Sequence, residues 1–254
     1  SRTNFQLFCS AISGSDLSME RDHAFESRCY FDDLPASQSI GSLAGSRAVA
    51  KQNSRKPPTG EYPVVFDERV SASLIIHFLS AINGTALVRG SSWLLDSLGK
   101  SAFPENLSLE EDPTRLKTAG SRLFDSEGLS TRKKKIVKNG IIKHYILDLR
   151  TARKLNLEPT GNASRKLCST PFPTVGNIEL TGGNLSPKEI LSDIGEGLLV
   201  TSLIGVTINP NTGDYSRGAS GFWIKNGNIS YPVNECTIAG NLKDIFMEII
   251  PAND

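Results

Sequence analysis

Apolar residues recur every three or four positions in two parts of the chain, which is the spacing of a helix with one buried face. One such stripe lies within residues 37–51, and a second runs through residues 68–82. The second stripe follows Asp67, a favourable N-cap, and precedes Asn83-Gly84, a favourable helix stop. Its members are Val70, Leu74, Phe78 and Ala81, widened by Ile75, Leu79 and Ile82. The pattern predicts two amphipathic helices.

Shorter helices are expected nearer the C-terminus. Residues 151–157 form one candidate, and residues 186–195 form another. In the latter, Ser186 is placed to cap the helix, Pro187 suits its first position, and Glu189 completes a capping box. Residues 241–250 read as a final helix or strand.

Strand signals separate these helices. Residues 3–13 and 19–30 are expected to pair through a turn, and 62–67 reads as a buried strand. Two hairpins are predicted at Asn139-Gly140 and Asn226-Gly227, because this dipeptide tolerates the positive φ angles of a tight hairpin turn. The apolar run 197–208 reads as a further strand. Since helices and strands do not alternate regularly, the pattern favours an α+β fold with mixed, mainly antiparallel sheets.

Two segments lack a period. Residues 52–63 are polar and hold three prolines, so they are the best candidate linker. Residues 158–185 read as a long loop, which in a compact domain is functional or disordered.

The composition of the chain argues against some classes of binding partner. Lys and Arg number 28 against 27 Asp and Glu, a net charge of +1, which offers no electrostatic case for nucleic acid or an anionic membrane. The run 197–208 is too short to span a bilayer. The four cysteines form no CxxC pair, so they are expected to be reduced thiols of a cytoplasmic protein: Cys9, Cys29, Cys168 and Cys236.

His77 is the first candidate for chemistry, because it interrupts the apolar stripe of the second helix. A zinc hydrolase helix carries two histidines one turn apart with a glutamate beside the water. Here Ser73 and Ala81 lie four positions from His77, and Phe78 follows it. The residues favour a histidine at the helix edge with a hydrogen-bonded partner.

An acidic pair and a basic run could also carry function, but each has a purely structural interpretation. Asp125 and Glu127 would share a face of a strand and could act as acid and base, but they also suit a solvated turn. The run 132–135, Arg-Lys-Lys-Lys, could meet nucleic acid, but lysines at a strand edge also prevent unwanted pairing. No convincing active site emerges from the residues.

Four stretches of the chain do resemble a known family, the TldD/PmbA metallopeptidases, and most closely its PmbA branch, also called TldE. They are "MERDHAF", "YPVVFDERVSASLIIHFLSAINGTALVRGSSWLLDSLGK", "FDSEGLSTRKKKIVKNGIIKHYILDLRTARKLNL" and "TGDYSRGASGFWIKNGNISYPVNECTIAGNLKDI". The resemblance covers nearly the whole chain. It implies that residues 1–58 are the end of an N-terminal domain and a linker, and that 59–254 are a C-terminal domain truncated before its last segment.

The resemblance also implies a function. The family is described as bacterial, cytosolic metallopeptidases that trim leader peptides and degrade unstructured proteins, and historically as modulators of DNA gyrase. The TldD branch carries a helical HExxxH motif and a cysteine as zinc ligands. If His77 is aligned with the first motif histidine, Phe78 stands at the glutamate position and Ile82 at the second histidine position. If His77 is aligned with the second motif histidine, Ala72 and Ser73 stand at the positions of the first histidine and the glutamate.

Neither register makes a zinc site, so no catalytic, metal or cofactor-binding residue is expected in this chain. The resemblance implies a non-catalytic subunit that joins a zinc-bearing TldD-type homologue in a heterodimer and handles unstructured peptides. A homodimer of the isolated chain stays open. Two other functions stay open as well: a stand-alone hydrolase that uses Asp125 and Glu127 or an unrecognised nucleophile, and a module that associates with gyrase or DNA.

Overall fold

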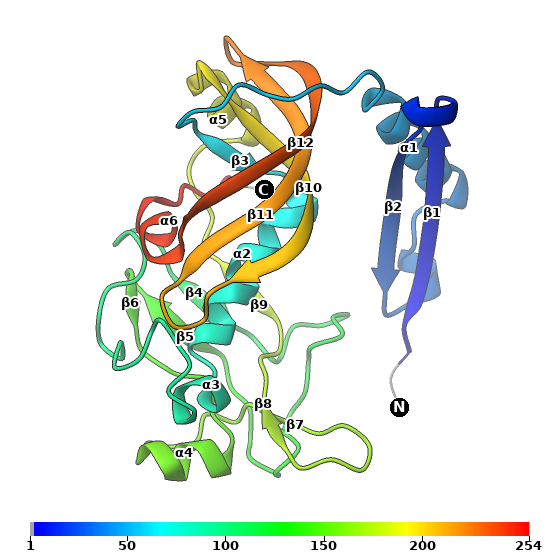
Figure 1. The fold of residues 1–254 in the computed structure, drawn as a ribbon. Coiled ribbons are helices and arrows are strands. Elements are labelled where there is room, and N and C mark those ends of the chain that lie inside the picture. Colours follow the sequence, from blue (N-terminus) through cyan, green and yellow to red (C-terminus); the bar gives the residue numbers. More distant parts are fainter. Residues whose placement is uncertain (1–2, 254) are drawn as a thin grey trace.

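The computed structural model describes residues 3–253, apart from the side chains of Leu17, Val206 and Thr207. It has an N-terminal hairpin with its helix, a long curved sheet, a smaller sheet, and a helix between the two sheets (Figure 1). The fold is therefore α+β with mainly antiparallel sheets, as the pattern predicts.

The N-terminal unit pairs β1 (Phe5–Ser13) with β2 (Glu20–Arg28) in antiparallel register around a short 3-10 turn, Asp16–Ser18. A second 3-10 turn (Phe31–Asp33) leads to α1 (Ser37–Ala50), which covers one face of the hairpin. Asp22 of β2 ties this unit to the rest of the chain. Its carboxylate lies 3.1 Å from Lys51 Nζ and 3.3 Å from Arg69 Nη1.

The long sheet has the strand order β12-β11-β10-β3. Its three long strands are β10 (Glu196–Ile208), β11 (Asp214–Lys225) and β12 (Asn228–Asn241). β11 and β12 meet at the predicted Asn226-Gly227 turn, where φ is 49° and 73°. The short strand β3 (Val64–Phe66) runs parallel to β10 and pairs with residues 198–200 alone.

The smaller sheet has the order β6-β5-β4-β9: β4 (Leu109–Glu111), β5 (Lys134–Lys138), β6 (Ile141–Ile142) and β9 (Ile178–Leu180). The predicted turn at Asn139-Gly140 joins β5 to β6. β7 (Ala163–Ser164) pairs with β8 (Phe172–Pro173). Residues 158–185 thus contain three short strands that the sequence pattern does not predict, although most of the segment is loop as expected. Strands of two or three residues are too short to show a period of two.

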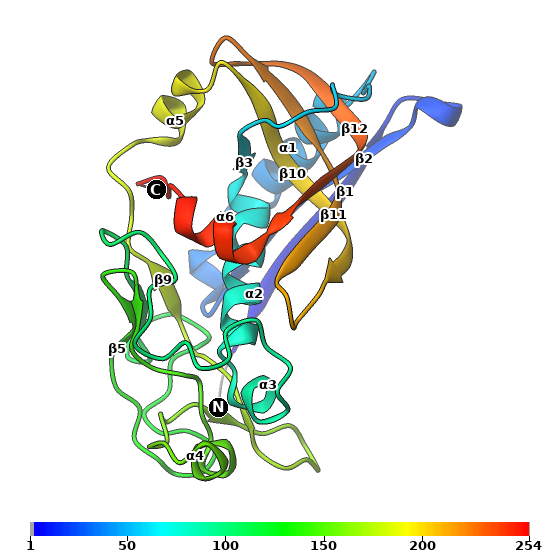
Figure 2. The same ribbon diagram turned by 60° about the vertical axis from the view of Figure 1, so that its left-hand side comes forward.

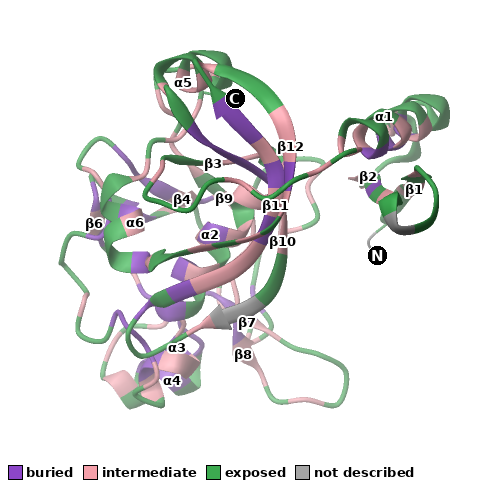
Figure 3. Ribbon diagram, turned by 45° about the horizontal axis from the view of Figure 1, so that its top comes forward, coloured by how far each residue is buried: buried purple, intermediate pink, exposed green. Residues whose placement is uncertain are grey.

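Helix α2 (Glu68–Ala81) lies between the long sheet and the smaller one (Figure 2). Near its N-terminus Val70 packs on the cluster of Leu198 and Trp223. Near its C-terminus Phe78 is fully buried, with its ring centroid 4.8 Å from that of Phe103 and 5.6 Å from that of Phe246. The predicted stripe is therefore the centre of the core, which Figure 3 shows as buried residues along α2.

The predicted stop at Asn83-Gly84 has a different role in the structure. α2 ends at Ala81, and Asn83 caps the next helix, α3 (Gly84–Val88), by accepting a hydrogen bond from Thr85 N. A Cβ atom on Gly84 would lie 2.5 Å from Thr151 Oγ1. The glycine is needed for the close approach of α3 to α4 (Leu149–Leu155), which tertiary packing decides.

The remaining helices lie where the sequence predicts them, except that α4 begins two residues before the predicted 151–157. Asp148 caps α4, Ser186 and Glu189 form the capping box of α5 (Pro187–Asp193), and the last candidate segment is a helix, α6 (Leu242–Glu248). In the described part of the chain no helix has the length and apolarity that crossing a bilayer requires.

Candidate functional site

His77 lies on α2 where the helix faces β11. Asp67 starts the helix by accepting a hydrogen bond from Arg69 N at 3.1 Å, and the apolar stripe then holds the helix against both sheets. The His77 ring meets the Tyr215 ring edge-on, with 6.0 Å between centroids. The predicted place of His77 at the edge of the stripe is confirmed.

The predicted hydrogen-bonded partner of His77 is not found. Its Nε2 atom is buried, and no described residue offers that atom a hydrogen bond. Burial lowers the pKa of His77, and the positive charge of Arg217 lowers it further. The imidazole is therefore neutral at pH 7, with an unmet capacity to donate or accept one hydrogen bond.

Tyr215 and Arg217 come from the same face of β11, because alternate residues of a strand share a face. Tyr215 is 2% exposed, and burial raises the pKa of its hydroxyl while Arg217 opposes that rise. The Nε of Arg217 donates to the carbonyl of Gly205 at 2.8 Å. That bond ties β11 to β10 where β10 has an irregular register between Ile204 and Thr207.

Beyond Val200, β10 has an open edge. Val200 O accepts the last bond on the β3 side, from Asp67 N at 3.0 Å, and the described strands place no neighbour beside residues 202–208 there. Ile204 on this stretch is 65% exposed. An open edge offers backbone donors and acceptors to an extended peptide. His77, Tyr215, Arg217 and the β10 edge together make the candidate site.

Sequence reasoning offers 197–205 as one candidate for a peptide-pairing edge, beside the two Asn-Gly hairpins, but it misses Tyr215 and Arg217. The spacing of Tyr215 and Arg217 could have placed them on one strand face. The pairing of β3 with three residues of β10, which leaves the edge open, is a long-range event without a local signal.

The side chains around His77 do not fit zinc. Phe78 and Ile82 occupy the two further motif positions in the first register, and both are 0% exposed and packed in the core. The second register offers Ala72 and Ser73. Within residues 3–253 no three or more His, Cys, Asp or Glu side chains gather as a metal site would require.

The other two histidines lie on other elements. His23 is on β2, where its ring stacks on Phe8 with 5.7 Å between centroids. His144 follows β6, and burial lowers its pKa. All four cysteines are unpaired.

Asp125 and Glu127 are engaged separately with the backbone. The Asp125 carboxylate accepts from the amides of Glu127, Leu129 and Ala163 at 2.9–3.0 Å. Glu127 Oε2 accepts from Leu149 N at 2.8 Å, at the start of α4. Because both carboxylates hold loops in place, the pair does not form an acid–base site.

The basic run 132–135 is divided between two sides of β5. Lys133 and Lys135 both pair with Glu110, at 3.0 Å and 3.2 Å. Lys134 points inward to the buried Glu111, at 2.9 Å. The three lysines of the run therefore have acidic partners on β4, so the run is not a basic patch.

Comparison with known proteins agrees with this architecture. The sequence profile of the family described as PmbA/TldA metallopeptidase C-terminal domain matches residues 59–254. "Metalloprotease PmbA" of Escherichia coli O157:H7 is 40% identical over 98% of this chain and 53% of its own length. The "Metalloprotease PmbA homolog" of Haemophilus influenzae is 39% identical over 99% of this chain and 54% of its own.

Solved structures show the same fold. A protein of Bacteroides thetaiotaomicron described as a modulator of DNA gyrase superposes with a TM-score of 0.89 at 29% identity, over 99% of this chain and 55% of that one. TldE of Thermococcus kodakarensis has a TM-score of 0.85 at 24% identity, over 96% of this chain and 56% of that one.

The matched profile and relatives define the class of this domain, the C-terminal domain of PmbA/TldA metallopeptidases. The chain belongs to the PmbA/TldD metallopeptidase family. It spans about half the length of the curated relatives it matches.

Proposed function

We propose that this chain is a PmbA/TldE-like subunit that works with a zinc-bearing TldD-type homologue in cytoplasmic proteolysis and peptide maturation, and that it is not catalytic on its own. The observation that carries the proposal is the packing of α2. Where the family's zinc motif needs a glutamate and a second histidine, Phe78 and Ile82 are core residues with 0% exposure. Restoring ligands there would require dismantling the core.

The chain's contribution is to hold an extended peptide at the open edge of β10. Peptide addition to a sheet edge reads mostly backbone, which suits unstructured substrates of varied sequence. The neutral His77 and the Arg217 guanidinium lie near this end of the sheet. The partner's zinc would supply the Lewis acid and the activated water.

The test uses the full-length chain, co-expressed with its zinc-bearing homologue. We expect a stable complex that cleaves unstructured peptides and loses that activity with a chelator, while this chain alone cleaves nothing. Chelator-resistant peptidase activity of this chain alone would overturn the proposal. So would full activity of the zinc-bearing homologue without this chain.

Leu203 allows a sharper test of the edge. Leu198 N and Val200 O bond toward β3, and the one-residue register shift after Val200 turns the backbone of Leu203 toward the open side. Proline there removes an N–H that no described residue uses, which an edge strand tolerates. Leu203→Pro should therefore lower peptide cleavage by the complex about tenfold, the worth of a lost hydrogen bond with steric exclusion.

Leu203→Ala is the matched control, because it removes the same side chain and keeps the N–H. Its cleavage rate should stay near that of the unaltered complex. Equal losses in the two variants would assign the effect to the side chain and contradict strand addition at this edge.

A further inference from the structure

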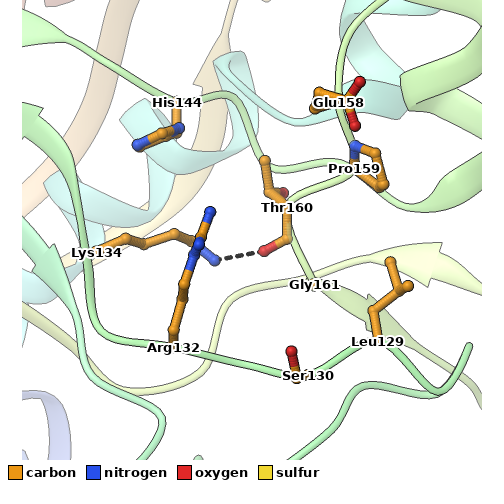
Figure 4. Close-up of a pocket in the computed structure, with 9 residues that line it drawn as sticks. All are labelled: Leu129, Ser130, Arg132, Lys134, His144, Glu158, Pro159, Thr160 and Gly161. Atoms are coloured by element: carbon orange, nitrogen blue, oxygen red, sulfur yellow. Dashed lines mark hydrogen bonds between the residues drawn. The ribbon is translucent and has the colours of Figure 1, made fainter.

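A pocket lies apart from the candidate site on α2, between the start of β5 and the segment that precedes β7. Its volume is about 360 Å³, enough for a side chain or a small metabolite. Arg132, Lys134 and His144 line it together with Ser130, Thr160 and Glu158. Figure 4 shows the three basic side chains on one side and Glu158 on the other.

Lys134 forms a wall of this pocket and has no donor left for a ligand. Its ammonium group bonds to Thr160 O at 2.6 Å, Asn162 Oδ1 at 2.8 Å and Glu111 Oε2 at 2.9 Å. An ammonium carries three N–H groups, so all of them are used. The buried Glu111 compensates its charge.

Arg132, unlike Lys134, has hydrogen-bond donors that no described residue uses. Within the described residues its guanidinium makes no ion pair and no hydrogen bond, although it carries five N–H donors. Glu110 and Glu111 of β4 are paired with the three lysines that follow Arg132. Arg132 is therefore the charge of this pocket that is free to meet a ligand.

The pKa of His144 is affected by the positive charges in this pocket. His144 is half-buried, and its pKa is lowered by burial and then by the charges of Lys134 and Arg132. Neutral at pH 7, it offers one N–H donor without adding charge. Ser130 adds a hydroxyl on the same pocket.

We propose that this pocket binds a carboxylate group, with the Arg132 guanidinium as its ion-pair partner. A planar guanidinium matches a carboxylate with two parallel hydrogen bonds. A single free positive charge, opposed by Glu158 across the pocket, suits a singly charged carboxylate better than a doubly charged phosphate. The carboxylate belongs either to a peptide, at its C-terminus or on an acidic side chain, or to a small free acid.

The peptide source rests on the proposed function, since it would give the peptide-handling subunit a preference for acidic or free C-terminal substrates. The small-acid source does not depend on it.

The test measures binding to the full-length protein without its partner. The probes are a fluorescent alanine hexapeptide with a free C-terminal carboxylate, the same peptide amidated, and acetate as a competitor. We expect amidation to weaken binding on the order of tenfold or more, the worth of a hydrogen-bonded charge pair. Arg132→Gln should abolish the difference between acid and amide, and the His144 ring signal in NMR spectra should shift with the acid alone.

Lys133→Gln is the matched control, because it removes a neighbouring positive charge whose ammonium pairs with Glu110 outside the pocket. It should keep the preference for the acid, and Glu158→Gln should strengthen acid binding several-fold. Displacement of the peptide by millimolar acetate would identify the small acid as the source, and peptide binding unmoved by acetate would identify the peptide.

The proposal of a carboxylate pocket would be overturned if the free-acid and amidated peptides bound equally well. It would also be overturned if Arg132→Gln and Lys133→Gln lost the preference for the free acid equally. Neither outcome bears on the complex with the zinc-bearing homologue, which is measured separately.

Discussion

Neighbouring residues on α2 have opposite energetic roles. Phe78 is surrounded by the rings of Phe103 and Phe246, whereas His77 lies at the helix edge against Tyr215. Phe78→Ala should lower the free energy of unfolding by about 3–5 kcal/mol, because it leaves a cavity in the core. His77→Gln should change it by no more than about 1 kcal/mol. Denaturant unfolding of the two variants checks this, and the reverse order would contradict the packing of α2.

The pH dependence of stability follows from the same histidine. Burial, and then Arg217, lowers the pKa of His77 below its ordinary value of about 6.5 in the unfolded chain. The unfolded state therefore binds the proton more readily, and stability falls as the pH drops from about 6.5 toward the folded pKa. Above pH 7 both states are neutral at this residue and the contribution is flat.

His77→Gln should reduce the loss of stability between pH 7 and pH 5 in urea unfolding. His144→Gln should act in the same direction, because burial and two positive charges lower the pKa of His144 as well. A steeper acid slope in His77→Gln would show that the sign is wrong.

At the scale of elements, a buried charge network connects the smaller sheet to the segment 158–185. The carboxylate of Glu111, 2% exposed, accepts from Lys134 on β5, from Asn162 at 2.9–3.0 Å, and from Gly176 N. Asn162 precedes β7, and Gly176 precedes β9. This carboxylate therefore contacts two separate points of a segment whose own strands are very short.

Glu111→Ala should destabilise the protein by about 3–5 kcal/mol, because it leaves the Lys134 ammonium buried without its partner. Limited proteolysis should then cut within 158–185 well before it cuts the unaltered protein. Glu110→Ala is the matched control: its carboxylate pairs with two exposed lysines, and surface pairs contribute about 0–1 kcal/mol. Early cleavage in both variants would mean that the network does not hold the segment.

At the scale of the whole molecule, stability should not depend on zinc. Complete ligand sets in structural sites contribute about 10–16 kcal/mol, and the residues around His77 do not form such a set. We expect the unfolding midpoint of the isolated chain to be the same with and without a chelator. Elemental analysis of metal-replete protein that found one zinc per chain would contradict this.

The sequence by itself determined the features that depend on near neighbours. The stripe of α2, the capping box at Ser186 and the two Asn-Gly turns are set by residues within about four positions, so local sterics and hydrogen bonds suffice to predict them. The family resemblance likewise follows from stretches read along the chain. The lack of a second zinc ligand beside His77 was visible in the same way.

Tertiary structure alone decided the rest, since it depends on contacts between distant parts of the chain. Asn83 caps α3 instead of ending α2, because Gly84 has to approach Thr151. The buried Glu111 carboxylate binds Asn162 in the segment 158–185. The Asp125 and Glu127 carboxylates accept hydrogen bonds from the backbone amides of Ala163 and Leu149. The Tyr215 ring on β11 meets His77 on α2, and β10 keeps an open edge because β3 is short. Pairing of remote segments costs chain entropy, which is offset only by contacts in the assembled core. No local sequence pattern therefore predicts such a pairing.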